Sequence, residues 1–100
     1  MDIIKTSNEN SVTLALSGRL DTVTSSKLGE ELAIIFDEGA IELVLNLEAL
    51  DYISSAGLRV LLTAQKKVNA LATTMKIINA NENVKEVFDV TGFSEILTIE

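Results

Sequence analysis

Two adjacent serines, Ser54 and Ser55, lie at the predicted start of a helix, where a hydroxyl can cap the helix or carry a phosphate. They follow an apolar segment, residues 41–47, and precede a segment of helical apolar spacing that begins near Ala56. The first backbone N–H groups of such a helix lack partners, and a serine hydroxyl can accept a hydrogen bond from one of them. The same N–H groups and the helix dipole can stabilise a phosphate on a serine oxygen. Spacing alone favours an ordinary cap.

Other side chains that usually support catalysis or metal binding are absent from the sequence. It contains no His and no Cys, which excludes Ser-His-Asp and Cys-His triads, disulfides and His or thiolate metal sites. It also lacks the Gly-x-x-x-x-Gly-Lys and Gly-x-Gly-x-x-Gly nucleotide-binding motifs. Asp21, Ser54 and Ser55 have no neighbouring base to activate a nucleophile. We therefore expect no enzyme activity, no catalytic residue, no metal and no cofactor of its own.

The charge balance further restricts the partners. Fifteen acidic and eight basic residues give a formal charge of −7, which disfavours nucleic acid and anionic membrane surfaces. The longest apolar runs, such as residues 41–47, are too short to span a bilayer, and residues 1–5 resemble neither a secretion signal nor a transit peptide. A cytoplasmic protein is expected, and the acidity alone does not specify its partner.

One hundred residues without linkers or repeats indicate a single domain, residues 1–100. Residues 3–4 open a short strand, residues 7–10 form a hairpin turn, and residues 12–17 alternate apolar and polar side chains up to Gly18. Residues 41–47 are nearly all apolar, as in the centre of a parallel sheet, and a loop is predicted over Glu48–Ser54. Residues 75–79 form another strand, and residues 96–99 a last strand or a packed segment.

Three helices are predicted between these strands. The first has Asp21, Thr22 and Thr24 as capping side chains and ends near Gly39. The second runs from about Ala56 to Leu71, with Arg59, Gln65, Lys66 and Lys67 facing water; the third begins at Asn81 and ends before Gly92. The resulting order, β-β-α-β-α-β-α-β, predicts an α/β fold with a mostly parallel sheet covered by helices.

Four segments, in order, resemble motifs of the anti-sigma factor antagonist family, whose members are STAS domains. Residues 54–58, Ser-Ser-Ala-Gly-Leu, resemble that family's Asp-Ser-Ser-Gly-Leu signature. Residues 16–21 resemble its Gly-x-Leu-Asp turn, residues 44–47 its central strand, and residues 84–93 its third-helix motif. The resemblance extends over nearly the whole chain and implies a STAS-like fold.

The resemblance also implies a regulatory site. Alignment on Gly57 and Leu58 places Ser55 on the family's phosphorylated serine and Ala56 on the residue after it. Ser54 stands where the family usually has aspartate, and Ser54 remains an alternative acceptor. The residues implied to contact a partner are Asp21, Ser54, Ala56, Gly57, Leu58 and Arg59. Taken without the resemblance, Asp21 is favoured as the cap of the first helix, and Arg59 as a solvated surface residue.

The function implied is that of a partner-switching phosphoprotein in transcription regulation. The unmodified protein would bind a serine-kinase-type anti-sigma factor and free a sigma factor, and phosphorylation of Ser55 with ATP from that kinase would release it. A phosphatase would reactivate it. The alternative is a STAS sensory or scaffold module of another signalling assembly, with no sigma factor involved.

Overall fold

The chain alternates strands and helices after an opening hairpin. The computed structural model describes residues 1–39 and 41–100. Its elements are β1 (Asp2–Ser7), β2 (Ser11–Leu20), α1 (Thr22–Asp37), β3 (Glu42–Ile53), α2 (Ser55–Ala70), β4 (Met75–Ile78), α3 (Glu82–Thr91) and a short 3-10 turn, Phe93–Glu95. The predicted α/β class is confirmed, as are the first seven elements of the predicted order, β-β-α-β-α-β-α.

The four strands form one sheet in the order β1-β2-β3-β4. β1 and β2 are an antiparallel hairpin, closed by a hydrogen bond of 2.8 Å from the Asn8 N–H to the Ser11 carbonyl. β2 pairs with β3, and β3 with β4, in parallel. The predicted mostly parallel sheet after an N-terminal hairpin is therefore confirmed.

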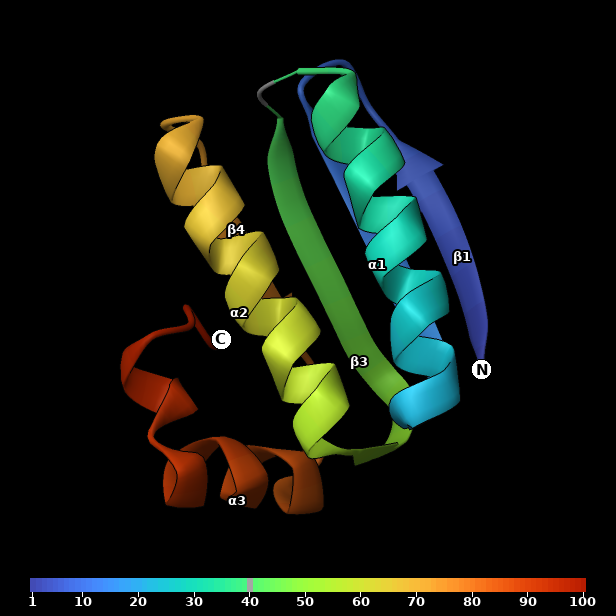
Figure 1. Ribbon diagram of the computed structural model, residues 1–100, viewed down its shortest axis with the longest axis vertical. Coiled ribbons are helices and arrows are strands. Elements are labelled where there is room, and N and C mark those ends of the chain that lie inside the picture. The colour runs from blue at the N-terminus through green and yellow to red at the C-terminus, as the bar shows by residue number, and fades with distance from the viewer. Residues whose placement is uncertain (40) are drawn as a thin grey trace.

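Helices α1 and α2 lie side by side on one face of the sheet, with their first turns at the same end (Figure 1). This end is where the carboxyl ends of β2 and β3 lie, because each helix directly follows its strand. α3 lies near the first turn of α2 (Figure 1). The core is mainly aliphatic. Its fully buried side chains include Leu14, Leu28, Leu45 and Leu61, together with the aromatic Phe88.

The central strand is longer than predicted. β3 continues through residues 48–53, where a loop was predicted, and Leu50 and Ile53 are buried. These residues pair with the end of β2, from Ser17↔Ala49 to Leu20↔Ile53. One shift in register, between Ala15 and Ser17, precedes this stretch, and a second, between Gly18 and Arg19, lies within it. Pairing with a distant strand satisfies the backbone groups that a loop would have left to water. As a result, Ser54 directly follows a paired strand.

The C-terminal segment is not a full strand. After the 3-10 turn, Leu97 is buried and Ile99 forms one parallel bridge with Ile77 of β4. The Ile77 N–H donates to the Thr98 carbonyl at 2.9 Å, and the Glu100 N–H donates to the Ile77 carbonyl at 2.8 Å. The final strand of the predicted order is thus reduced to a single bridge on the sheet edge.

Gln65 of α2 was expected to face water but is 9% exposed. Its Nε2 donates to Oδ1 of Asn69, one turn later, at 3.0 Å. The buried face of α2 is therefore wider than the leucine positions alone indicated. It includes the polar Gln65 beside Leu61 and Val68.

Candidate functional site

Ser54 is the N-cap of α2. Its backbone is extended, with φ −96° and ψ 173°, and its Oγ accepts a hydrogen bond of 3.2 Å from the Gly57 N–H. Its carbonyl accepts the Leu58 N–H at 2.9 Å, which is the first helical hydrogen bond. One of the unpaired donors of the helix start is therefore satisfied by Ser54, and its hydroxyl is already engaged.

Ser55 is the first residue of α2 and is exposed. Among residues 1–39 and 41–100, its hydroxyl has no side-chain hydrogen-bond partner within the protein. A group attached to this oxygen would extend into solvent beside the first turn, where helix N–H groups and the dipole favour negative charge. Ser54 and Ser55 therefore differ in two ways: Ser55 is more exposed to solvent, and the Ser54 hydroxyl already accepts a hydrogen bond.

A backbone hydrogen bond brings the starts of the two helices together. The Ser54 N–H donates to the Leu20 carbonyl at 2.9 Å, joining the ends of β3 and β2. Asp21, the next residue after Leu20, is the N-cap of α1. The residue implied to assist partner binding is thus placed at the same edge of the sheet as Ser54 and Ser55, as parallel α/β topology requires.

Asp21 forms a capping box with Thr24. Its Oδ1 accepts the Thr24 N–H at 3.0 Å and the Val23 N–H at 3.1 Å, and its own N–H donates to the Thr24 hydroxyl at 2.9 Å. The Thr24 N–H and hydroxyl lower the pKa of the Asp21 carboxyl below its ordinary value, with smaller contributions from the Val23 N–H and the Arg19 charge, against a small opposing effect of burial. Asp21 is therefore a negative charge at neutral pH and a confirmed helix cap.

Gly57 and Leu58, which the resemblance names among the partner-binding residues, belong to the covered part of the first turn of α2. Both are buried. A Cβ at position 57 would lie 2.8 Å from Leu20 Cγ and 3.0 Å from Ile53 Cγ1. Position 57 needs glycine because the first turn of α2 packs directly on the strand ends, and not because a partner approaches there.

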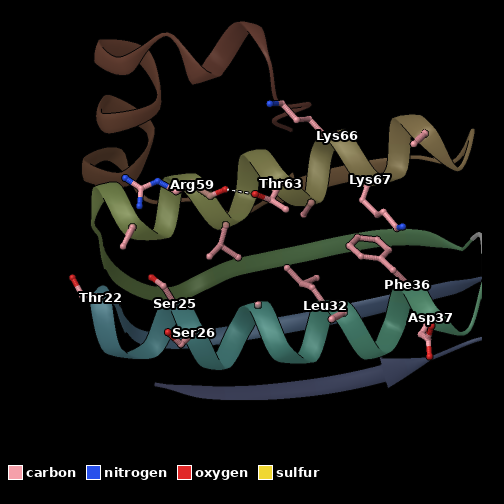
Figure 2. A pocket seen from close by; sticks show the side chains of 16 residues that line it. Thr22, Ser25, Ser26, Leu32, Phe36, Asp37, Arg59, Thr63, Lys66 and Lys67 are labelled. Carbon is pink, nitrogen blue, oxygen red and sulfur yellow. Dashed lines mark hydrogen bonds between the residues drawn. The ribbon is translucent and has the colours of Figure 1, made fainter.

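Ala56 and Arg59 lie on the outer side of the first turn of α2. Ala56 is half-buried and Arg59 is exposed. Both line a groove of about 870 Å³ between α1 and α2, with Thr22, Ser25 and Ser26 on the opposite wall (Figure 2). The accessible part of the predicted partner-binding set is therefore Asp21, Ser54, Ala56 and Arg59, around the exposed Ser55.

Sequence reasoning did not identify the rest of this groove. Gly29, Phe36 and Lys67 line it, on α1 and α2. Two features of the sequence could have indicated it. One is a glycine in the middle of a predicted helix, and the other is a segment, residues 55–70, with basic but no acidic side chains.

The arrangement of the site suits recognition. Within residues 1–39 and 41–100, no group of three or more acidic side chains is placed to hold a metal ion. Across the same residues, no helix has both the length and the apolar character needed to cross a bilayer. The start of α2 presents the exposed Ser55 hydroxyl, with the capping carboxylate of Asp21 at the same edge of the sheet and the exposed Arg59 one turn later.

Comparison with known proteins agrees with this arrangement. The family model for the STAS domain matches residues 2–100. The chain is 37% identical over 84 residues to BtrV of Bordetella bronchiseptica, a candidate anti-sigma factor antagonist, covering 84% of this chain and 72% of BtrV. It is 30% identical over 92 residues to the anti-sigma-B factor antagonist of Bacillus subtilis, covering 92% and 84% of the two chains.

Solved structures show the same fold. The unphosphorylated form of the anti-sigma factor antagonist SpoIIAA superposes with a TM-score of 0.86 at 20% identity, covering 99% of this chain and 88% of SpoIIAA. The phosphorylated form of Bacillus SpoIIAA gives a TM-score of 0.79 at 19% identity, covering 99% of this chain and 91% of that structure. The chain belongs to the STAS domain family, among the anti-sigma factor antagonists.

Proposed function

We propose that this protein is a phosphorylation-regulated partner switch that binds an anti-sigma factor of the serine-kinase type through the start of α2. The observation that supports this most directly is the exposure of Ser55 at the first position of α2, in a chain whose relatives are anti-sigma factor antagonists. Binding in the unmodified state would displace a sigma factor from the anti-sigma factor.

The contrast between the two serines supports Ser55 as the acceptor. The Ser54 hydroxyl accepts the Gly57 N–H, and the residue is partly covered. Phosphorylation of Ser54 would place a bulky dianion on a cap already in use. Ser55 has solvent access, and a phosphate on it would lie at the positive end of α2, one turn before Arg59. The modified protein is therefore expected to stay folded.

The chemistry belongs to the partner. Ser55 Oγ attacks the γ-phosphorus of ATP held by the kinase, the bond from that phosphorus to the β–γ bridging oxygen breaks, ADP leaves, and the hydroxyl proton passes to a base of the kinase. This chain supplies the acceptor and no catalytic group, cofactor or metal. Reactivation requires a phosphatase that hydrolyses the Ser55 ester.

The proposed release follows from charge and solvation. A phosphate adds about −1.5 to −2 charges and three strongly hydrated oxygens. The half-buried Asp21 and Ser54 already make the site polar and partly negative. A partner surface suited to a neutral hydroxyl cannot accommodate the dianion without desolvation. A penalty of about 3 kcal/mol would weaken binding roughly a hundredfold. We place this cycle in the cytoplasm, with residues 1–100 acting as one STAS domain.

One sequence feature favours the alternative, a STAS sensory or scaffold module without a sigma factor. Ser54 stands where the resembling signature has aspartate, so a kinase that reads that carboxylate would not recognise this chain. The test is incubation with ATP and each candidate anti-sigma kinase of the same genome, followed by phosphosite mapping by mass spectrometry. We expect phosphate on Ser55 in the wild type and in Ser54→Ala, and none in Ser55→Ala. Phosphate on Ser54 or Thr24, or none with any kinase, would contradict the proposal.

A further inference from the structure

The groove between α1 and α2 extends far beyond the start of α2. Its lining comes from both helices along nearly their full length, from Thr22 and Ala56 at one end to Asp37 and Ala70 at the other (Figure 2). Each helix has 16 residues, or about 24 Å of length. The groove is therefore long enough to hold a third helix of about the same length as α1 and α2.

The floor of the groove is apolar. Leu32, Phe36 and Val60 supply the larger apolar side chains, and Gly29, Ala33 and Ala64 keep the space between the helices open. Small side chains allow a third helix to approach closely enough for its ridges to enter the groove. An apolar groove of this shape fits the apolar stripe of an amphipathic helix.

Gly29 gives independent support for this use of the groove. It lies in the middle of α1, where glycine destabilises a helix relative to alanine. Packing within the protein does not require it, because a Cβ at position 29 would have no atom within 4 Å. Gly57, in contrast, is required by contact with Leu20 and Ile53. The missing side chain of Gly29 is thus explained by what it leaves open on the outer surface.

The charge of one wall specifies the partner. α2 contains Arg59, Lys66 and Lys67 and no acidic residue, so this helix is +3 while the whole chain is −7, and the remainder is −10. All three cations line the groove and are exposed, and Lys67 extends toward Phe36 across it (Figure 2). The two ion pairs formed by described residues, Lys5–Glu38 and Lys76–Glu100, leave these cations free for a partner.

We propose that the α1–α2 groove is a docking surface for an acidic amphipathic helix of a partner protein. Its apolar stripe would lie over Leu32, Phe36 and Val60, and its acidic side chains would face Arg59, Lys66 and Lys67. Charge complementarity directs such a helix to α2, because the rest of this acidic surface repels it. The groove shares Ala56 and Arg59 with the site around Ser55, but the inference is drawn from the groove lining and not from phosphorylation of Ser55.

The test uses the full chain, labelled with ¹⁵N, and a synthetic helical peptide of the length of α1, 16 residues. The peptide has a leucine stripe flanked by glutamates, and a matched peptide has lysine in place of every glutamate. We expect amide shifts confined to α1 and α2, and affinity for the acidic peptide at least about tenfold higher than for the basic one. Equal affinities, shifts centred on other elements or no binding of the acidic peptide would overturn the proposal.

Two variants with a matched control localise the contact. Gly29→Phe fills the groove while its Cβ meets open space, so the chain stays folded and peptide affinity falls at least about tenfold. Lys67→Glu reverses one charge of the wall and weakens binding about three- to tenfold. Lys85→Glu makes the same reversal on α3, outside the groove, and leaves affinity unchanged. Unchanged affinity in Gly29→Phe, with its fold verified by circular dichroism, would place the peptide elsewhere and contradict the assignment.

Discussion

The Oγ of Ser54 accepts a hydrogen bond of 3.2 Å from the backbone N–H of Gly57. This contact makes Ser54 the cap of α2 and leaves the neighbouring Ser55 exposed. The two serines therefore differ in structure: Ser54 caps the helix, and Ser55 is exposed, which is why we propose Ser55 as the phosphate acceptor.

Substitution of each serine is expected to separate these roles. Ser54→Ala removes the cap and should lower the free energy of unfolding by about 0.5–2 kcal/mol, while Ser54→Asp retains a capping oxygen and should stay close to wild type. Ser55→Ala removes no hydrogen bond found within the described residues and should change stability by less than about 0.5 kcal/mol. Urea denaturation of the three variants measures this, and a larger loss in Ser55→Ala than in Ser54→Ala would contradict the cap assignment.

Alanine substitution of the two helical glycines should change the stability of the protein in opposite directions. Gly57→Ala forces a Cβ against Leu20 and Ile53 and should destabilise the protein by about 1–3 kcal/mol. Gly29→Ala places its Cβ in open space and should stabilise by up to about 1 kcal/mol through helix propensity. Thermal unfolding of both variants checks the signs. Stabilisation by Gly57→Ala would show that α2 packs on the strand ends less closely than in this structure.

Asp21 should make stability depend on pH in the acidic range. Hydrogen bonds from Thr24 and Val23 hold its pKa below the ordinary value of 3.8 in the folded protein. Its contribution is therefore fully present above the unfolded-state pKa and is lost as the pH falls through the lower folded-state value. Asp21→Asn keeps a capping oxygen without the charge, so its stability difference from wild type should change below about pH 4 and stay constant near neutrality. A difference independent of pH from neutrality to pH 2 would contradict the lowered pKa.

Much of the fold could be predicted because its signals are local. Asp21, Asn81 and Gly92 mark helix ends through side chains or backbone conformations that act within a few residues. The continuation of β3 to Ile53 could not be predicted, because it depends on pairing with β2 across shifts in register. Gln65 was misplaced for a related reason, since its burial depends on tertiary packing around α2 and not on its polarity.

The candidate site was predicted in part. The sequence predicted a helix start at Ser54 and Ser55, and the family resemblance favoured Ser55 as the phosphate acceptor. Spacing could not show which of the two hydroxyls caps the helix. That distinction depends on the Gly57 hydrogen bond. The burial of Gly57 and the open space at Gly29 are also invisible in sequence, since both depend on how closely α2 and α1 approach their neighbours.

Substitutions of Ser55 should alter partner binding without unfolding the protein. Ser55→Asp places one negative charge at the start of α2, where the helix dipole favours it, so the variant should fold. It should nevertheless bind the anti-sigma kinase at least about tenfold more weakly than wild type. Ser55→Ala should bind as tightly as wild type and persist in the complex in the presence of ATP, as followed by size-exclusion chromatography. Release of Ser55→Ala by ATP would show that another residue controls dissociation.

The most direct measurement is the affinity of the anti-sigma kinase for this protein before and after stoichiometric phosphorylation at Ser55, by titration calorimetry in the presence of ADP. The partner-switch account predicts that phosphorylation weakens binding by roughly a hundredfold, equivalent to about 3 kcal/mol. Circular dichroism of both forms should show that the phosphorylated protein remains folded. Equal affinities of the two forms for the kinase would contradict the switch.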